Sequence, residues 1–107
     1  MTTRKLGELA RIIRSKNAGP FELTFDVMFD DIRVYERVKA SGVFDAELFA
    51  RLYRVPREHV LSVHSFDPAL TLKATITRPV SSGTAGDTDV FGAQQHAPLL
   101  DVDVPWD

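Results

Sequence analysis

The side chains best suited to ligand chemistry occur in one short basic segment, Arg14-Ser15-Lys16-Asn17-Ala18-Gly19. It combines two cations, Arg14 and Lys16, with the amide of Asn17 and a flexible glycine. These groups could hold a carboxylate or a phosphate through charge-assisted hydrogen bonds. The segment is not a nucleotide-binding P-loop, because it lacks the Gly-x-x-x-x-Gly-Lys spacing. The alternative is that the two cations only complement the negative end of a preceding helix.

A second group of polar side chains lies between residues 78 and 98, where the sequence has neither helical nor strand periodicity. A loop of about twenty residues is uncommon in a compact domain and is often functional. We interpret it as a ligand or partner contact, with simple loop solvation as the alternative. The candidate ligand-binding residues in this segment are Arg78, Ser82, Asp89, Gln95 and His96.

The composition excludes several kinds of reaction centre. The chain has no Cys, which excludes zinc–thiolate and iron–sulfur sites, redox dithiols and a cysteine nucleophile. Its three histidines, His59, His64 and His96, are not at ligand spacing, so the sequence predicts no metal site and no cofactor. No Ser-His-acid arrangement stands out, and neither Glu22 nor Asp26 shows a reason for a shifted pKa. The catalytic residues therefore stay unassigned.

Length and charge define the broad class of protein. The 107 residues, 44% of them hydrophobic and 26% charged, fit a single globular domain over residues 1–107. A net charge of −2 without an extended basic stripe argues against nucleic-acid binding. No apolar run is long enough to cross a membrane, and the N-terminus lacks a signal-peptide core, so we expect a cytoplasmic protein.

Periodicity predicts the elements that position these side chains. Residues 21–29 alternate between apolar and mostly polar, which is typical of a half-buried strand, and Phe25 lies mid-strand on the apolar face. Asp26, on the other face, is expected to form an exposed cross-strand pair of little energetic consequence with Lys73. The other predicted elements are helices over residues 6–16, 31–40 and 45–55, an antiparallel hairpin of 59–66 with 70–77, and a last strand over 99–104.

The order of these elements predicts an α+β fold. Asp45 is expected to cap a helix, with Phe44 and Phe49 placed as a hydrophobic staple. The apolar face of the sheet must be covered by helices. The strand–helix–strand–strand–crossover–strand order matches a ferredoxin-like sandwich. We therefore predict a four-stranded, mainly antiparallel sheet with helices on one face and a long loop before the last strand.

Five segments of the sequence carry a family resemblance: residues 13–21, 26–30, 78–83, 86–90 and 94–99. They resemble a family of small bacterial proteins classed as a domain of unknown function. Its members accompany, or are fused to, acyclic-terpene-utilisation (AtuA-like) proteins, whose own small domain is described as ferredoxin-like. The resemblance implies a small partner subunit in the catabolism of acids or their acyl-CoA esters, and it assigns no catalytic residue.

The resemblance and the basic segment together predict a small subunit or accessory domain of an AtuA-like assembly. The assembly would act on a carboxylate or an acyl-CoA by hydratase or lyase chemistry, with this subunit non-catalytic or sharing the site. Arg14, Lys16 and Asn17 would bind the anionic group, and Gln95 and His96 would contact substrate or partner. The alternative is an independent homo-oligomeric protein that binds a small ligand without catalysis.

Overall fold

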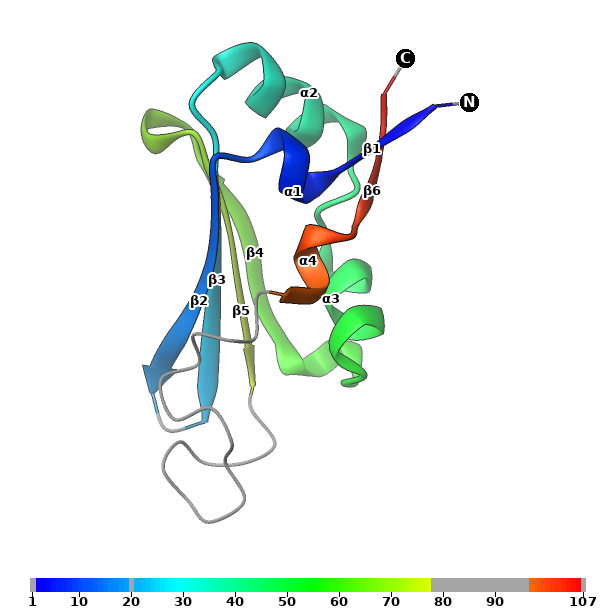
Figure 1. The fold of residues 1–107 in the computed structure, drawn as a ribbon. Helices are drawn as coiled ribbons and strands as arrows, with labels where there is room; N and C mark the ends of the chain where they lie inside the picture. Colours follow the sequence, from blue (N-terminus) through cyan, green and yellow to red (C-terminus); the bar gives the residue numbers. More distant parts are fainter. Residues whose placement is uncertain (1, 20, 78–96, 107) are drawn as a thin grey trace.

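The computed structural model describes residues 2–19, 21–77 and 97–106 of the chain (Figure 1). The strands are β1 (Thr3–Lys5), β2 (Ile12–Gly19), β3 (Glu22–Met28), β4 (Val60–Phe66), β5 (Thr71–Thr77) and β6 (Asp103–Pro105). The α-helices are α1 (Leu6–Leu9), α2 (Ile32–Ser41), α3 (Ala46–Tyr53) and α4 (Ala97–Leu100), and the 3-10 turns are η1 (Arg57–His59) and η2 (Asp67–Ala69). The result is a small domain that combines antiparallel sheets with helices.

The main sheet has four antiparallel strands in the order β2-β3-β5-β4, which are supplied by two hairpins. The predicted strand over residues 21–29 is confirmed as β3, and the predicted hairpin is confirmed as β4 and β5. Alternation along β3 decides burial: Leu23, Phe25 and Val27 are buried in the core. Phe21, which was expected to share that face, precedes β3 and is exposed.

The helix predicted over residues 6–16 is wrong, because α1 ends at Leu9 and the rest of the segment forms β2. Strand β2 pairs with β3, and the Arg11 N–H donates to the Met28 carbonyl at 2.8 Å where the pairing begins. The apolar spacing of this segment fits a helix, but as a strand it adds a ladder of backbone hydrogen bonds to β3 and packs Ile13 against the core. Tertiary pairing therefore overrides the local pattern.

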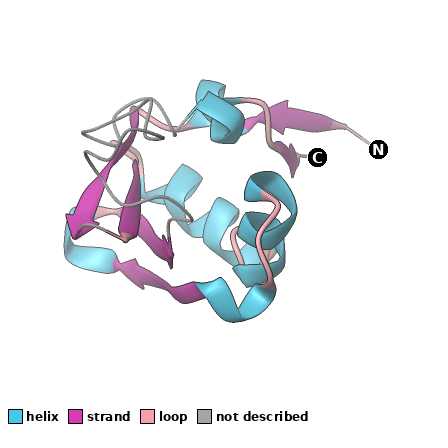
Figure 2. Ribbon diagram, turned by 90° about the horizontal axis from the view of Figure 1, so that it is seen from below, coloured by secondary structure: helices cyan, strands magenta, loops and turns pink. Residues whose placement is uncertain are grey.

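The last strand predicted over residues 99–104 is also wrong in its position. The segment begins as α4, and β6 then pairs with β1 in a separate two-stranded sheet. Figures 1 and 2 show this pair apart from the main sheet. Strand β2 takes the fourth place in the main sheet. Along the chain, that sheet is therefore built from the β2–β3 hairpin and the β4–β5 hairpin, with helices α2 and α3 between them. This order differs from the strand–helix–strand repeat on which the ferredoxin-like prediction depended.

Helices α2 and α3 begin at the caps that the sequence predicts. The Asp31 side chain accepts from the Arg33 N–H at 2.8 Å, and the Asp45 side chain accepts from the Leu48 N–H at 2.9 Å. The rings of Phe44 and Phe49 meet edge to face with centroids 5.1 Å apart, which confirms the predicted staple. These local contacts set where the helices start above the sheet.

The core lies between the main sheet and the helices. Phe25 at the centre of β3 packs against Phe49 and Tyr53 of α3, with ring centroids 5.2 and 4.8 Å away. Phe29 packs similarly against Tyr35 of α2. Figure 1 shows the strands of the main sheet on one side of the molecule and α3 on the other. Within the described part of the chain, no helix covers the opposite face of the sheet, which we call the open face.

Candidate functional site

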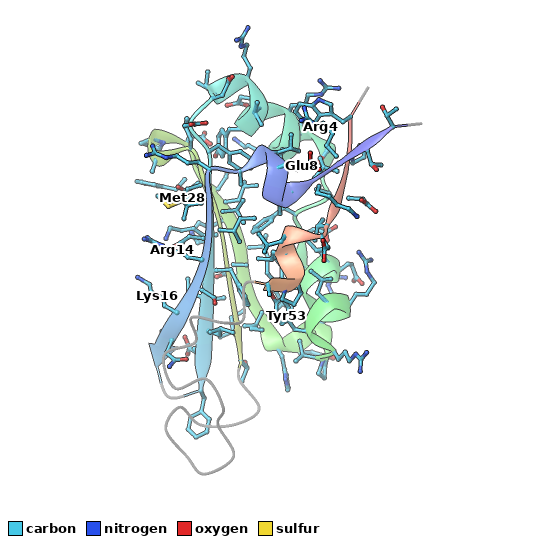
Figure 3. The ribbon with its side chains drawn as sticks, in the orientation of Figure 1. Arg4, Glu8, Arg14, Lys16, Met28 and Tyr53 are labelled. Carbon is cyan, nitrogen blue, oxygen red and sulfur yellow. The ribbon has the colours of Figure 1, made fainter. Side chains whose placement is uncertain are left out.

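Charged side chains meet in one row across the open face. The strand register places Arg14 of β2 opposite Asp26 of β3, Asp26 opposite Lys73 of β5, and Lys73 opposite His64 of β4. Figure 3 shows Arg14 pointing away from the helices, on the same side as Lys16. The row therefore crosses all four strands of the main sheet. We call it the charged row.

Asp26 is the centre of the charged row. Its Oδ2 accepts from Arg14 Nε at 3.0 Å, and its Oδ1 accepts from Lys73 Nζ at 2.8 Å. Although it lies on the open face, its side chain is only 2% exposed. The prediction of an exposed pair is therefore wrong for Asp26, because two longer side chains from the flanking strands cover this short carboxylate.

The electrostatics of Asp26 follow from these two contacts. Burial by itself would raise the pKa of the carboxyl group, because it disfavours the charged form. The hydrogen bonds from Lys73 and Arg14 and the charges of both groups outweigh that effect and hold the pKa below its ordinary value. Asp26 is therefore ionised at neutral pH and locked between two cations, which makes it a positioning group and a poor proton donor.

The next row of the open face adds positive charge and hydroxyl groups. Lys16 stands opposite Thr24, and Thr24 stands opposite Thr75. The two threonine hydroxyl oxygens lie 3.3 Å apart, and Ser62 of β4 continues the row beyond Thr75. Across the two rows, three cations (Arg14, Lys16 and Lys73) face one carboxylate. Glu22, which follows the same alternation along β3, adds a second carboxylate to the open face, so the face keeps an excess of one positive charge and offers hydroxyl groups beside its cations.

The row on the other side of the charged row is apolar at its ends. Ile12 of β2 stands opposite Met28 of β3, and Phe66 ends the row on β4. The side chains of Ile12 and Phe66 are large, apolar and exposed. The open face therefore has a cationic half, formed by the first two rows, and a third row with one exposed apolar side chain at each end.

The structure brings together only part of the predicted site. Arg14 and Lys16 lie on the open face, two residues apart on one strand. Asn17 points to the other side, because it pairs with Leu23, whose side chain is in the core. The remaining predicted site residues, Arg78, Ser82, Asp89, Gln95 and His96, lie outside the described residues.

Sequence reasoning missed the central role of Asp26 and its tie to Arg14. Alternation correctly placed Asp26 and Lys73 on the same face. Arg14 could be placed beside Asp26 only if residues 12–19 were predicted as a strand. The helical spacing of the apolar residues in this segment indicated a helix instead. A charge at every second position, as at Arg14 and Lys16, was the one local signal for a strand with an exposed face.

The fold and this site define a small α+β domain whose open sheet face carries a cluster of cations. The chain belongs to the family described as "Domain of unknown function (DUF4387)", whose model matches residues 6–103. No curated protein and no solved structure gives a significant match.

Two further observations concern the described residues alone. Among them, no helix is long and apolar enough to cross a membrane. They also contain no group of three or more His, Asp or Glu side chains placed to hold a metal ion.

Proposed function

We propose that this domain is a small subunit or accessory module of an AtuA-like catabolic assembly in the cytoplasm, acting on a carboxylate or an acyl-CoA substrate. The family resemblance supports the choice of partner. The cationic half of the open face supports the choice of ligand, since carboxylates and the phosphates of coenzyme A are both anions. The reaction would be a hydration or a lyase step.

The observation that carries this proposal is the charged row with Lys16 beside it. Asp26 accepts from Nε of Arg14, which leaves both Nη groups of that guanidinium outside the bond. Lys73 likewise gives Asp26 one of its three donors. Asp26 thus holds the two side chains in place while the face keeps its positive excess. An anion that reaches this face would meet preoriented donors.

The same arrangement favours a binding role over a catalytic role for this face. A carboxylate with a lowered pKa that is held by two cations has little capacity to transfer protons near neutral pH. The open face would therefore orient an anionic group while a larger partner supplies the reacting groups. In this arrangement the subunit shares a site and is not an enzyme by itself.

Ligand binding can be tested by calorimetric titration with coenzyme A and acetyl-CoA. The double variant Arg14→Gln/Lys16→Gln should lower the affinity by more than about tenfold, because hydrogen bonds to charged groups each contribute about 1.5–3 kcal/mol. The matched control Arg33→Gln/Arg51→Gln makes the same charge change on α2 and α3 and should bind like the parent. Equal affinities for both double variants would contradict the proposal.

The partner can be tested separately by affinity capture of the tagged chain from its native cells. A larger AtuA-like protein, identified by mass and retained in a fixed ratio, is the expected result. Retention of the chain alone would contradict the subunit proposal and favour the alternative, a homo-oligomeric protein that binds a small ligand. The observation that supports this second candidate is that β4, an edge strand of the main sheet, carries no Lys, Arg, Asp or Glu.

A further inference from the structure

The main sheet has two outer edges of different character. Strand β2 forms one edge and carries Arg14 and Lys16. Strand β4 forms the other edge, with the sequence Val-Leu-Ser-Val-His-Ser-Phe and no Lys, Arg, Asp or Glu. Charged side chains are a common means of preventing edge strands from pairing with other chains. The edge of β2 therefore has this protection, whereas the edge of β4 lacks it.

The β4 edge also exposes apolar side chains and borders two hollows. Leu61 and Phe66 are large hydrophobic residues with about half of their surface exposed, 51% and 50%. A hollow of about 500 Å³ runs beside residues 60–63, and a second hollow of about 180 Å³ runs beside residues 63–65. Both hollows have Phe44 and Val63 in their walls, so they lie next to each other on the helix side of the strand.

We propose that β4 is a homodimer interface, in which the β4 strands of two copies pair antiparallel and join the two main sheets. The occupant is a second copy because pairing of β4 with itself brings no like charges together. Pairing of β2 with itself would bring Arg14 and Lys16 of one copy beside those of the other. Strand β4, which lacks a formal charge, is thus the edge strand that can pair with the same strand of a second copy without charge repulsion.

The register of this pairing follows from an irregularity in β4. The pairing of β4 with β5 shifts between Val60 and Ser62, so the regular part of the strand is residues 62–66. Antiparallel pairing of this part with itself centres on His64. Ser62 then lies opposite Phe66 of the second copy, and both side chains are on the open face of the joined sheet. Each copy thereby covers an exposed phenylalanine of the other.

The proposal is independent of ligand binding, so it is tested on the purified chain without any ligand. Sedimentation equilibrium should give the dimer mass at micromolar concentrations. Phe66→Glu should give a monomer, because it puts a charge in the interface. The matched control Phe21→Glu changes a phenylalanine of similar exposure, 55%, outside β4 and should remain a dimer. A parent chain that stays monomeric, or a Phe66→Glu variant that stays dimeric, would overturn the proposal.

The register can be tested with a single disulfide, because the chain has no cysteine. The His64→Cys variant places one thiol at the centre of the proposed pairing. Opposite residues in antiparallel strands have Cα atoms about 4.5–5.5 Å apart, which suits a disulfide. Mild oxidation should convert this variant to a covalent dimer, and the control Lys16→Cys on β2 should remain uncross-linked. Equal cross-linking of both variants would overturn pairing through β4.

Discussion

Removal of the charge at Asp26 tests whether the charged row holds the open face together. In Asp26→Asn the side chain keeps its size but loses its charge, so its single amide oxygen can accept from only one of Arg14 and Lys73 while its NH2 group faces the other cation. Breaking a fully buried ion pair costs about 3–5 kcal/mol. Here the cost is lower, because Arg14 and Lys73 are 55% and 35% exposed and regain water when the carboxylate is lost. We expect a loss of about 2 kcal/mol in the free energy of unfolding.

A loss of this size is easy to measure in a domain of this length. One kcal/mol corresponds to roughly 4–8 °C in Tm for domains of about 100 residues, so Asp26→Asn should melt about 10 °C lower. Asp103→Asn is the matched control, because Asp103 accepts from Lys5 at the same 2.8 Å but is 58% exposed. Exposed ion pairs contribute little, so this control should melt close to the parent.

The pH dependence gives a second, independent readout. The folded-state pKa of Asp26 is lowered, so its contribution is fully present above the unfolded value of about 3.9. That contribution is lost as the pH falls through the folded-state pKa. The difference in unfolding free energy between parent and Asp26→Asn should therefore shrink on acidification below about pH 4. A constant difference, or equal melting of Asp26→Asn and Asp103→Asn, would refute a stabilising carboxylate at the centre of the row.

Two further predictions concern the core and a helix cap. Phe25→Ala should lose about 3–5 kcal/mol in the free energy of unfolding, because Phe25 is fully buried against Phe49 and Tyr53, and a Tm within two or so degrees of the parent would contradict this. Asp45→Ala should lose about 1 kcal/mol in urea unfolding, because the Leu48 N–H loses its acceptor, and unchanged stability would show that the cap is dispensable.

The elements that the sequence predicted correctly are those whose signals are local. Strands β3 and β5 follow from strict alternation, and the β4–β5 hairpin follows from the strand predicted over residues 59–66 and the turn at Pro68 that joins it to β5. Helix α3 follows from the Asp45 cap and its hydrophobic staple. In each of these cases, the side chains that determine the element lie within a few residues of it. Local free energies therefore suffice to identify the element.

The elements that the sequence predicted wrongly depend on partners far along the chain. Residues 12–16 lie on β2 because pairing with β3 and packing of Ile13 against the core outweigh the helical spacing of their apolar side chains. Residues 103–105 pair with β1 across the whole length of the chain, which no local pattern indicates. The position of each segment is therefore decided by the strand with which it pairs, β3 for residues 12–16 and β1 for residues 103–105.

The candidate site shows the same division between sequence and tertiary structure. The sequence by itself determined the residue types and, through alternation, that Asp26 and Lys73 share a face. Only the tertiary structure decided that Arg14 joins them, since its place depends on the pairing of β2 with β3. The burial of Asp26 was decided in the same way. A short carboxylate on an open face becomes buried only when longer side chains from both neighbouring strands close over it.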